Sequence, residues 1–196
     1  MPKINYIFLA ILLVFSISCN QTYLPKKQEI GFSGKPFVLN VANITVIEEY
    51  TTSKKLPNVE GLSDITPSDA LKKWVSDRLV AGGNKNTAEV VITDAHINKK
   101  QIPKTKSGVE GYFTNEQTEE YFGELAVEIK IYDERRNLPI AKINVSSKNT
   151  RTLPENATII DHENIYHDMS IELMTLLENS LNQNIKDHFG NYIIYR

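Results

Sequence analysis

Hydrophobic and polar residues alternate along four segments of the chain, and this period of two predicts β-strands. The alternation is clearest where Leu125 and Val127 share one face while Glu124 and Glu128 occupy the other. One face of this strand should therefore lie in the core and the other in solvent. The four predicted strands span residues 37–48, 88–98, 120–132 and 140–147.

Two other segments repeat their apolar residues every three or four positions, which is the period of an amphipathic helix. The first starts at Thr66-Pro67, a capping residue followed by a proline suited to the first turn, and should stop at Gly82-Gly83. The second is longer, with Asp161 as its capping residue and Gly190 at its end. The two apolar stripes consist of Leu71, Trp74, Val75 and Leu79, and of Ile165, Met169, Leu173, Leu176, Leu177, Leu181, Ile185 and Phe189.

The elements follow one another as strand, helix, strand, strand, strand, helix. This order predicts one α+β domain over residues 37–196, in which two helices pack on one face of a four-stranded, mostly antiparallel sheet. The first strand loses its alternation near residues 42–43, where we expect a β-bulge. Residues 49–65 form a long connection, and we expect it to pack over the sheet edge or a helix; binding is the alternative.

The N-terminal segment has the composition of a secretory signal. Lys3 supplies a positive charge, and residues 4–17 are apolar apart from Asn5 and Ser16. A run of about 14 residues is shorter than the roughly 20 that cross a membrane, but it suits the apolar region of a signal peptide. We therefore expect residues 1–18 to be a cleaved signal peptide.

Cys19 follows this run directly and is the only cysteine in the chain, which excludes an intrachain disulfide. The sequence Ser16-Ile17-Ser18-Cys19 resembles the lipobox of bacterial lipoproteins, although that family prefers leucine where this chain has Ser16. The resemblance implies that Cys19 carries acyl chains such as palmitate and anchors the protein in a membrane. Asn20, in place of aspartate, implies the outer rather than the inner membrane, with the domain facing the periplasm. An incidental cysteine after a cleaved signal, or an uncleaved single-span anchor, are the alternatives.

Residues 20–36 are polar and contain two prolines and two glycines, a composition typical of a flexible tether. With Cys19 they form a lipidated N-terminus, residues 19–36, ahead of the domain. The formal net charge of the whole chain is −2. This balance argues against a nucleic-acid partner, which requires a basic surplus or stripe.

Histidines are the first candidates for catalysis or metal binding, and the chain has four: His96, His162, His167 and His188. On a helix, His162 and His167 point roughly 140° apart and cannot hold one metal ion together. We expect His167 to form an exposed ion pair with Glu163, four positions earlier. The chain also lacks HExxH, GxSxG and glycine-rich phosphate-loop motifs. We therefore expect no enzymatic activity, no cofactor and no metal.

Four acidic residues, Glu116, Glu119, Glu120 and Glu124, gather before and within the third predicted strand. They lack the spacing and the turn glycine of a calcium loop. We interpret them as a solvated strand edge that discourages pairing with other chains.

The segment 97–115 joins two predicted strands and is basic and then aromatic. Its positive charges could contact anionic lipid headgroups, with the aromatic rings at the interface. A mobile lysine-rich hairpin tip is the alternative interpretation. The candidate binding residues are Lys99, Lys100, Lys104, Lys106, Tyr112 and Phe113.

The order of elements behind a lipoprotein signal resembles the lipopolysaccharide-assembly lipoprotein of the outer-membrane translocon and the auxiliary lipoproteins of ABC-type transporters. At residue level, Leu56-Pro57-Asn58-Val59-Glu60, Trp74 with Asp77-Arg78-Leu79, and Pro154-Glu155-Asn156-Ala157-Thr158 resemble an uncharacterised group of alphaproteobacterial lipoproteins.

The element order, the anchor and the missing active-site motifs together predict a noncatalytic envelope lipoprotein. Its expected role is accessory or assembly work in lipid or lipopolysaccharide transport or outer-membrane biogenesis, with a transporter or translocon protein as partner and a lipid as a further candidate. A lipid- or glycan-binding periplasmic module and a cell-envelope hydrolase are the alternatives.

Overall fold

The computed structural model describes residues 30–103, 116–135 and 138–195 of the chain. Its strands are β1 (Phe37–Leu39), β2 (Asn43–Glu48), β3 (Leu79–Ala81), β4 (Thr87–Gln101), β5 (Gln117–Tyr132) and β6 (Pro139–Pro154). Its helices are α2 (Pro67–Arg78) and α4 (Ile159–Phe189), with single turns of 3-10 helix at η2 (Glu60–Leu62) and η3 (Gly190–Tyr192).

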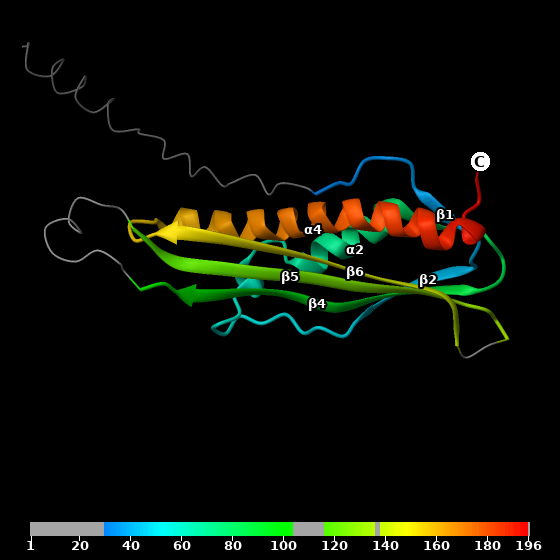
Figure 1. Cartoon of the computed structure of the whole chain (residues 1–196), viewed down its shortest axis with the longest axis horizontal. Coiled ribbons are helices and arrows are strands. Elements are labelled where there is room, and N and C mark those ends of the chain that lie inside the picture. Colours follow the sequence, from blue (N-terminus) through cyan, green and yellow to red (C-terminus); the bar gives the residue numbers. More distant parts are fainter. Residues whose placement is uncertain (1–29, 104–115, 136–137, 196) are drawn as a thin grey trace, which may run out of the picture.

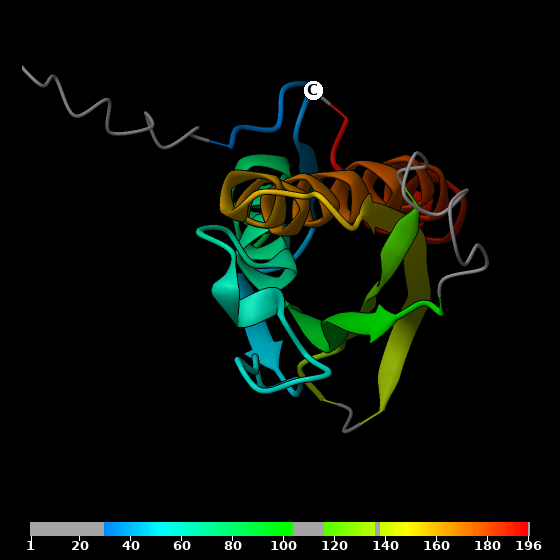
Figure 2. The same ribbon diagram turned by 90° about the vertical axis from the view of Figure 1, so that its left-hand side faces the viewer.

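The main sheet has four strands in the order β2-β4-β5-β6. β2 runs parallel to β4, while the other neighbours are antiparallel. α2 and α4 lie together on one side of this sheet, which curves around them (Figures 1 and 2). The predicted α+β class, the mostly antiparallel sheet and the two helices on one face are therefore confirmed.

The core lies between the sheet and the two helices. In β5, alternate residues from Tyr121 to Ile131 are buried, as the sequence predicted. They meet a stripe of fully buried residues on α4 that includes Met169 and Leu173. Leu176 was predicted to belong to that stripe, but its side chain is 46% exposed. The stripe advances in steps of four residues, so Leu176, three after Leu173, falls on its flank.

The first predicted strand, residues 37–48, is two strands in two different sheets. β1 pairs in parallel with β3 in a separate two-stranded sheet, whereas β2 joins the main sheet beside β4. The predicted bulge is the break between them: Val41 is buried and the Ala42 N–H donates to the Lys85 carbonyl at 2.9 Å. The loss of alternation thus marks a change of sheet and not a bulge.

The first helix ends at Arg78, earlier than predicted, and Leu79 already pairs with Phe37 in the small sheet. The two following glycines serve close packing instead of ending the helix. A Cβ on Gly82 would lie 2.3 Å from Val38 Cγ1, and one on Gly83 would lie 2.7 Å from the backbone carbon of Asn40. The predicted start of the helix is correct, because Thr66 forms a capping box with Asp69.

The second helix is capped by Thr158, three residues before the predicted cap. The Thr158 hydroxyl accepts from the Asp161 N–H at 3.2 Å, and the Asp161 carboxylate accepts from the Thr158 N–H at 2.7 Å. Asp161 is therefore the third helical residue of a capping box. The bond that the Thr158 N–H donates to this carboxylate, followed by a second one from the Thr158 hydroxyl at 2.7 Å, holds the pKa of Asp161 below its usual value.

Candidate functional site

The first described residues lie on the helix layer. The Phe32 N–H donates to Asp77 Oδ2 at 3.1 Å, and Arg78 Nη1 donates to the Ser33 carbonyl at 2.9 Å. The Arg78 guanidinium also stands over the Phe37 ring, 5.7 Å from its centre. A hydrogen bond from Lys73 and then that from Phe32 lower the pKa of Asp77. The last turn of α2 thus fixes the part of the predicted tether that the structure describes.

This segment and α4 flank a groove of about 580 Å³. One wall is the N-terminal segment that includes Phe32, and the other is a run of mostly acidic and polar residues of α4. The lining residues are Ile30, Gly31, Phe32, Ser33, His167, Asp168, Ile171, Glu172, Thr175 and Glu178.

Carboxylates in the groove are held by donors from the rest of the fold. Glu172 accepts from Arg151 Nε at 2.9 Å and from Asn149 Nδ2 at 2.6 Å. Glu178 Oε1 accepts from Trp74 Nε1 at 3.1 Å and lies 3.6 Å from Arg78 Nε. The groove therefore has fixed acceptors on its α4 wall.

His167 lies at one end of the groove, and its ion pair differs from the predicted one. Its Nδ1 lies 2.8 Å from Asp64 Oδ1, in the connection before α2. The predicted partner Glu163 is on the same helix, whereas the observed partner comes from a segment about 100 residues earlier in the chain. This pair ties α4 to the start of α2.

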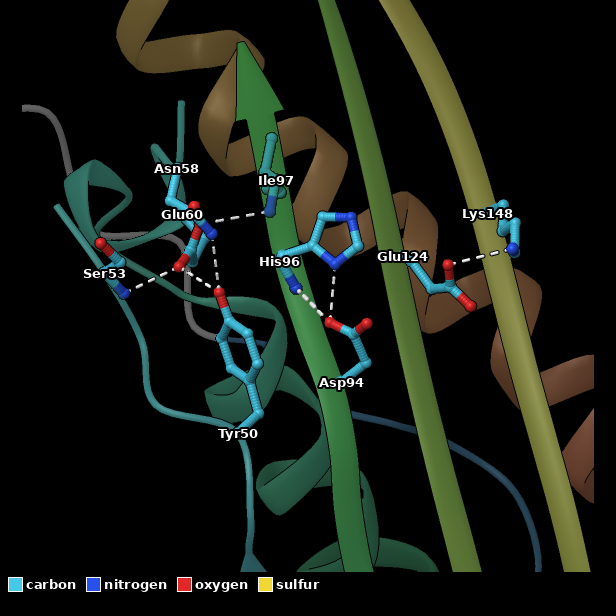
Figure 3. A network of polar contacts seen from close by, with 9 residues as sticks. All are labelled: Tyr50, Ser53, Asn58, Glu60, Asp94, His96, Ile97, Glu124 and Lys148. Carbon is cyan, nitrogen blue, oxygen red and sulfur yellow. Dashed lines mark hydrogen bonds and ion pairs between the residues drawn. The ribbon is translucent and has the colours of Figure 1, made fainter. Parts of the chain in front are cut away.

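A buried carboxylate, Glu60, organises the connection between β2 and α2 (Figure 3). Its side chain is fully buried and accepts three hydrogen bonds. The donors are the Tyr50 hydroxyl at 2.6 Å, the Ser53 N–H at 2.7 Å and the Ile97 N–H at 3.2 Å. Asn58 Nδ2 in turn donates to the Tyr50 hydroxyl at 3.0 Å. Burial, followed by the bond to Glu60, raises the pKa of Tyr50.

The same connection follows the edge of β4 beyond the end of β2. The Val59 N–H donates to the Ile97 carbonyl at 2.8 Å, and the Lys99 N–H donates to the Pro57 carbonyl at 2.7 Å. The prediction that residues 49–65 pack over the sheet edge is therefore confirmed.

The face of the sheet that is turned away from the helices carries paired charges (Figure 3). His96 Nδ1 lies 2.7 Å from Asp94 Oδ1, and Lys148 Nζ lies 3.0 Å from Glu124 Oε2. The register of β4 shifts between Ile92 and Asp94. This irregularity exchanges the two faces of the strand, so that Asp94 and His96 come to the polar side.

Glu119 is the centre of a second network, in which β4, β5 and α4 meet. It accepts from Lys99 Nζ at 2.7 Å, from the Tyr121 hydroxyl at 2.6 Å and from Gln101 Nε2 at 3.2 Å. His162 Nε2 lies 2.9 Å from Glu119 Oε2, the oxygen that also accepts from Tyr121. Burial raises the pKa of Glu119, but the hydrogen bonds from Lys99, Tyr121 and Gln101 outweigh it and bring the pKa to about 2.

The acidic residues of β5 were predicted to mark a solvated strand edge, and this interpretation is wrong. β5 lies inside the sheet, between β4 and β6. Glu119 and Glu120 face β4 residues on one side and β6 residues on the other, and Glu124 pairs with Lys148 across to β6. Glu116, just before the strand, also has an interaction partner. The carboxylates of Glu119 and Glu124 thus join neighbouring elements.

The predicted basic and aromatic binding loop is described only in part. Lys99 and Lys100 belong to β4 and not to a loop, and Lys99 is paired with Glu119. The remaining candidates, Lys104, Lys106, Tyr112 and Phe113, lie outside the described residues. Binding at this loop stays a prediction.

Cys19 also lies outside the described residues. Within residues 30–103, 116–135 and 138–195, no group of three or more His, Cys, Asp or Glu side chains is placed to hold a metal ion. In the same part of the chain, neither helix combines the length and apolar composition needed to cross a membrane.

No family model matches the sequence, and the search of curated proteins found no match. Among solved structures, the chain is similar to a minor lipoprotein from Acinetobacter baumannii, with 9% identity, a TM-score of 0.38, and coverage of 74% of this chain and 93% of that one. It is also similar to an uncharacterised lipoprotein B from Nitrosomonas europaea, with 17% identity, a TM-score of 0.39, and coverage of 76% and 86%.

Rare lipoprotein B from Shewanella oneidensis gives 9% identity, a TM-score of 0.37, and coverage of 74% of this chain and 97% of that one. All three neighbours are lipoproteins by name. Their TM-scores lie below 0.5, so the alignments do not establish a shared function. The resemblance to alphaproteobacterial lipoproteins and to the lipopolysaccharide-assembly lipoprotein stays a prediction.

Proposed function

We propose that the chain is a noncatalytic lipoprotein of the cell envelope, held by acylated Cys19 at the periplasmic side of the outer membrane. There it serves as an accessory or assembly component of lipid or lipopolysaccharide transport or of outer-membrane biogenesis, through contact with a transporter or translocon protein. The proposal rests first on the apolar run that ends at Ser16-Ile17-Ser18-Cys19.

The docking of residues 32 and 33 on α2 is the structural observation that carries the proposal. It leaves only residues 20–29 between the lipid-bearing cysteine and the first described residue. A chain of this length spans about 35 Å when fully extended. The helix layer would therefore stay close to the membrane, within reach of a membrane-embedded partner.

The two buried or half-buried carboxylate networks support a noncatalytic role. Glu60 accepts three hydrogen bonds from its own fold, and Glu119 contacts four side chains. Carboxylates bound in this way hold segments together, whereas a general acid or base has to exchange protons with a substrate.

The decisive test compares the full chain with a Cys19→Ala variant in the native host. We expect metabolic acyl labelling and membrane retention in the first and neither in the second. Pull-down from detergent-solubilised membranes should recover transporter or translocon subunits with the full chain. Unchanged labelling and retention in Cys19→Ala would contradict the anchor, and recovery of the chain alone would contradict the assembly role.

A glycan-binding role is the second candidate, and the groove beside α4 favours it. Fixed carboxylates can accept hydrogen bonds from sugar hydroxyls, while Phe32 supplies an apolar residue to the facing wall. Native mass spectrometry of protein released directly from membranes should then detect a retained glycan. Phe32→Ala should abolish glycan retention. Leu176→Ala should preserve it, because Leu176 is exposed on α4 but does not line the groove.

A further inference from the structure

β2 and β6 are the two edge strands of the main sheet and form its two margins (Figure 2). In the described part of the chain, β2 pairs with β4 on one side and with no strand of the sheet on the other. Val46 and Ile47 are 37% and 36% exposed. Such an edge presents unpaired backbone donors and acceptors to any extended polypeptide.

The two margins differ in how they are protected. β6 has a proline at each end and carries the exposed cations Lys142 and Lys148, which discourage pairing with another strand. β2 contains no proline and no lysine, and its first five residues, Asn43–Ile47, carry no charge. β2 is therefore the margin suited to accept a further strand.

The ladder with β4 shows which backbone groups of β2 are open. The Glu49 N–H donates to the Ile92 carbonyl at 3.0 Å, just after β2 ends. Because backbone groups alternate between the two sides of a strand, those of Thr45 point toward β4 and those of Ile44 and Val46 point toward the open side. A new antiparallel strand centred on Thr45 would thus meet Ile44 and Val46 as hydrogen-bonding residues.

We propose that β2 pairs antiparallel with β2 of a second copy of this chain, about a twofold axis at Thr45. In this register, Ile44 of one copy faces Val46 of the other, twice by symmetry. Opposite residues of an antiparallel pair project to the same face of the sheet. Both aliphatic contacts fall on the helix side, since Ile44 and Val46 lie beside the buried Ala88 and Val90 of β4.

Charges at the two ends of β2 match this antiparallel arrangement. Exposed Glu49 follows the strand, whereas the Glu48 carboxylate before it is already paired with Lys72 of α2 at 2.7 Å. Exposed Lys85 lies beside the start of β2, because its carbonyl accepts from the Ala42 N–H. Antiparallel pairing brings Glu49 of each copy to the Lys85 end of the other, which no parallel arrangement would do. This complementarity selects a second copy as the occupant.

The strand pair is short, and a stable interface normally buries about 1,200 Å² or more. The dimer should therefore be weak in dilute solution and populated where copies are concentrated on one membrane. Only this last step rests on the proposed function. The pairing itself depends on β2 alone, and a membrane-retention assay on the same samples tests the anchor separately.

The test places a thiol at the proposed axis in the full chain in native membranes. In a Thr45→Cys variant, the two added cysteines would face each other as a non-hydrogen-bonded pair with Cα atoms about 4.5 Å apart, within disulfide reach. Ser146→Cys puts a matched exposed thiol on β6, at the other margin. The unmodified chain shows any cross-linking through Cys19. We expect mild oxidation to give a covalent dimer with Thr45→Cys and not with the two controls.

A second variant separates pairing from chance collision. Val46→Lys added to Thr45→Cys sets positive charges beside the axis and should reduce the dimer several-fold. Thermal unfolding followed by circular dichroism checks that this exposed substitution leaves the fold intact. Cross-linking of Thr45→Cys no greater than that of Ser146→Cys, or undiminished by Val46→Lys, would overturn the proposal. So would an adduct that contains another protein.

Discussion

Glu60 and Glu119 are both held by several donors, but their surroundings differ. Glu60 is fully buried, and its donors are one phenol and two backbone N–H groups, all neutral. The Glu119 side chain is 15% exposed and sits against Lys99 and His162 as well as Tyr121 and Gln101. The Glu60 network therefore consists of a carboxylate bound by neutral, buried donors, whereas the Glu119 network includes partly exposed basic side chains.

The two networks stabilise two different kinds of junction in the fold. Glu60 fixes an irregular connection, where the backbone has few regular partners of its own. Glu119 joins regular elements that already have their ladders and helical bonds, so its network adds to an existing framework. Loss of the fully buried Glu60 carboxylate should therefore cost more free energy of unfolding than loss of the partly exposed Glu119 carboxylate.

Glu60→Ala should produce the largest effect. The substitution leaves the Tyr50 hydroxyl and the N–H groups of Ser53 and Ile97 without their acceptor in a buried site. We expect the free energy of unfolding to fall by about 4 kcal/mol, because each orphaned buried donor costs about 1–3 kcal/mol. Urea unfolding at pH 7 measures this change.

Glu163→Ala is the control, since Glu163 is exposed on α4 and its replacement should cost under about 0.5 kcal/mol. Hydrogen exchange should also show faster opening of the Ile97 amide in Glu60→Ala. A loss below about 1 kcal/mol would mean that water replaces the carboxylate, and that the contrast between the two sites does not hold.

Regular elements could be predicted from the sequence because their signals are local. The alternation around Leu125 and the stripe around Leu173 each fit within one segment, and both led to the correct face. The capping box Thr158-x-x-Asp161 was equally local and could have been found from its spacing. The signal that ends α2 is not local, since residues 79–81 form strand β3 by pairing with β1, about 40 residues earlier in the chain.

The two networks could not be predicted because their partners come from distant segments. Nothing near Glu60 in the sequence indicates that the Ile97 amide lies above it, 37 residues later. The acidic residues of β5 suggested an edge because the order of strands in the sheet was unknown. Once β5 lies between β4 and β6, Glu119 has neighbours on both sides and its charge joins them.

Glu119→Gln should have an intermediate effect. Glutamine keeps the shape and one acceptor, but it removes the negative charge beside Lys99 and His162. We expect the free energy of unfolding at pH 7 to fall by about 2 kcal/mol, because hydrogen bonds to charged groups contribute about 1.5–3 kcal/mol. Glu163→Gln is the control for a carboxylate-to-amide change on the surface. A cost equal to that of Glu60→Ala would remove the distinction between the sites.

Acid should abolish the difference in stability between the native chain and Glu119→Gln. The pKa of Glu119 is about 2 in the folded chain against an ordinary value of 4.5. The folded pKa is the lower one, so the stabilisation is complete above pH 4.5 and is lost as the pH falls toward 2. Unfolding curves of the native chain and Glu119→Gln should therefore converge between these values. A constant gap from pH 7 to pH 2 would contradict the assignment of the effect to the ionised carboxylate.

Salt should produce the smallest of the expected effects, a change in the cost of Glu119→Gln but not in that of Glu60→Ala. Ions at high concentration screen exposed charges, and the Debye length falls to about 3 Å at 1 M. The cost of Glu119→Gln should therefore shrink by about 0.5 kcal/mol between 0.05 and 1 M NaCl, since surface ion pairs contribute about 0.2–1 kcal/mol. The cost of Glu60→Ala should not change, because its donors are neutral and enclosed. Both variants are measured by urea unfolding against the native chain at each salt concentration, so general salt effects on the fold cancel. An equal response of the two sites would show that charge is not what distinguishes them, and that burial alone sets their contributions.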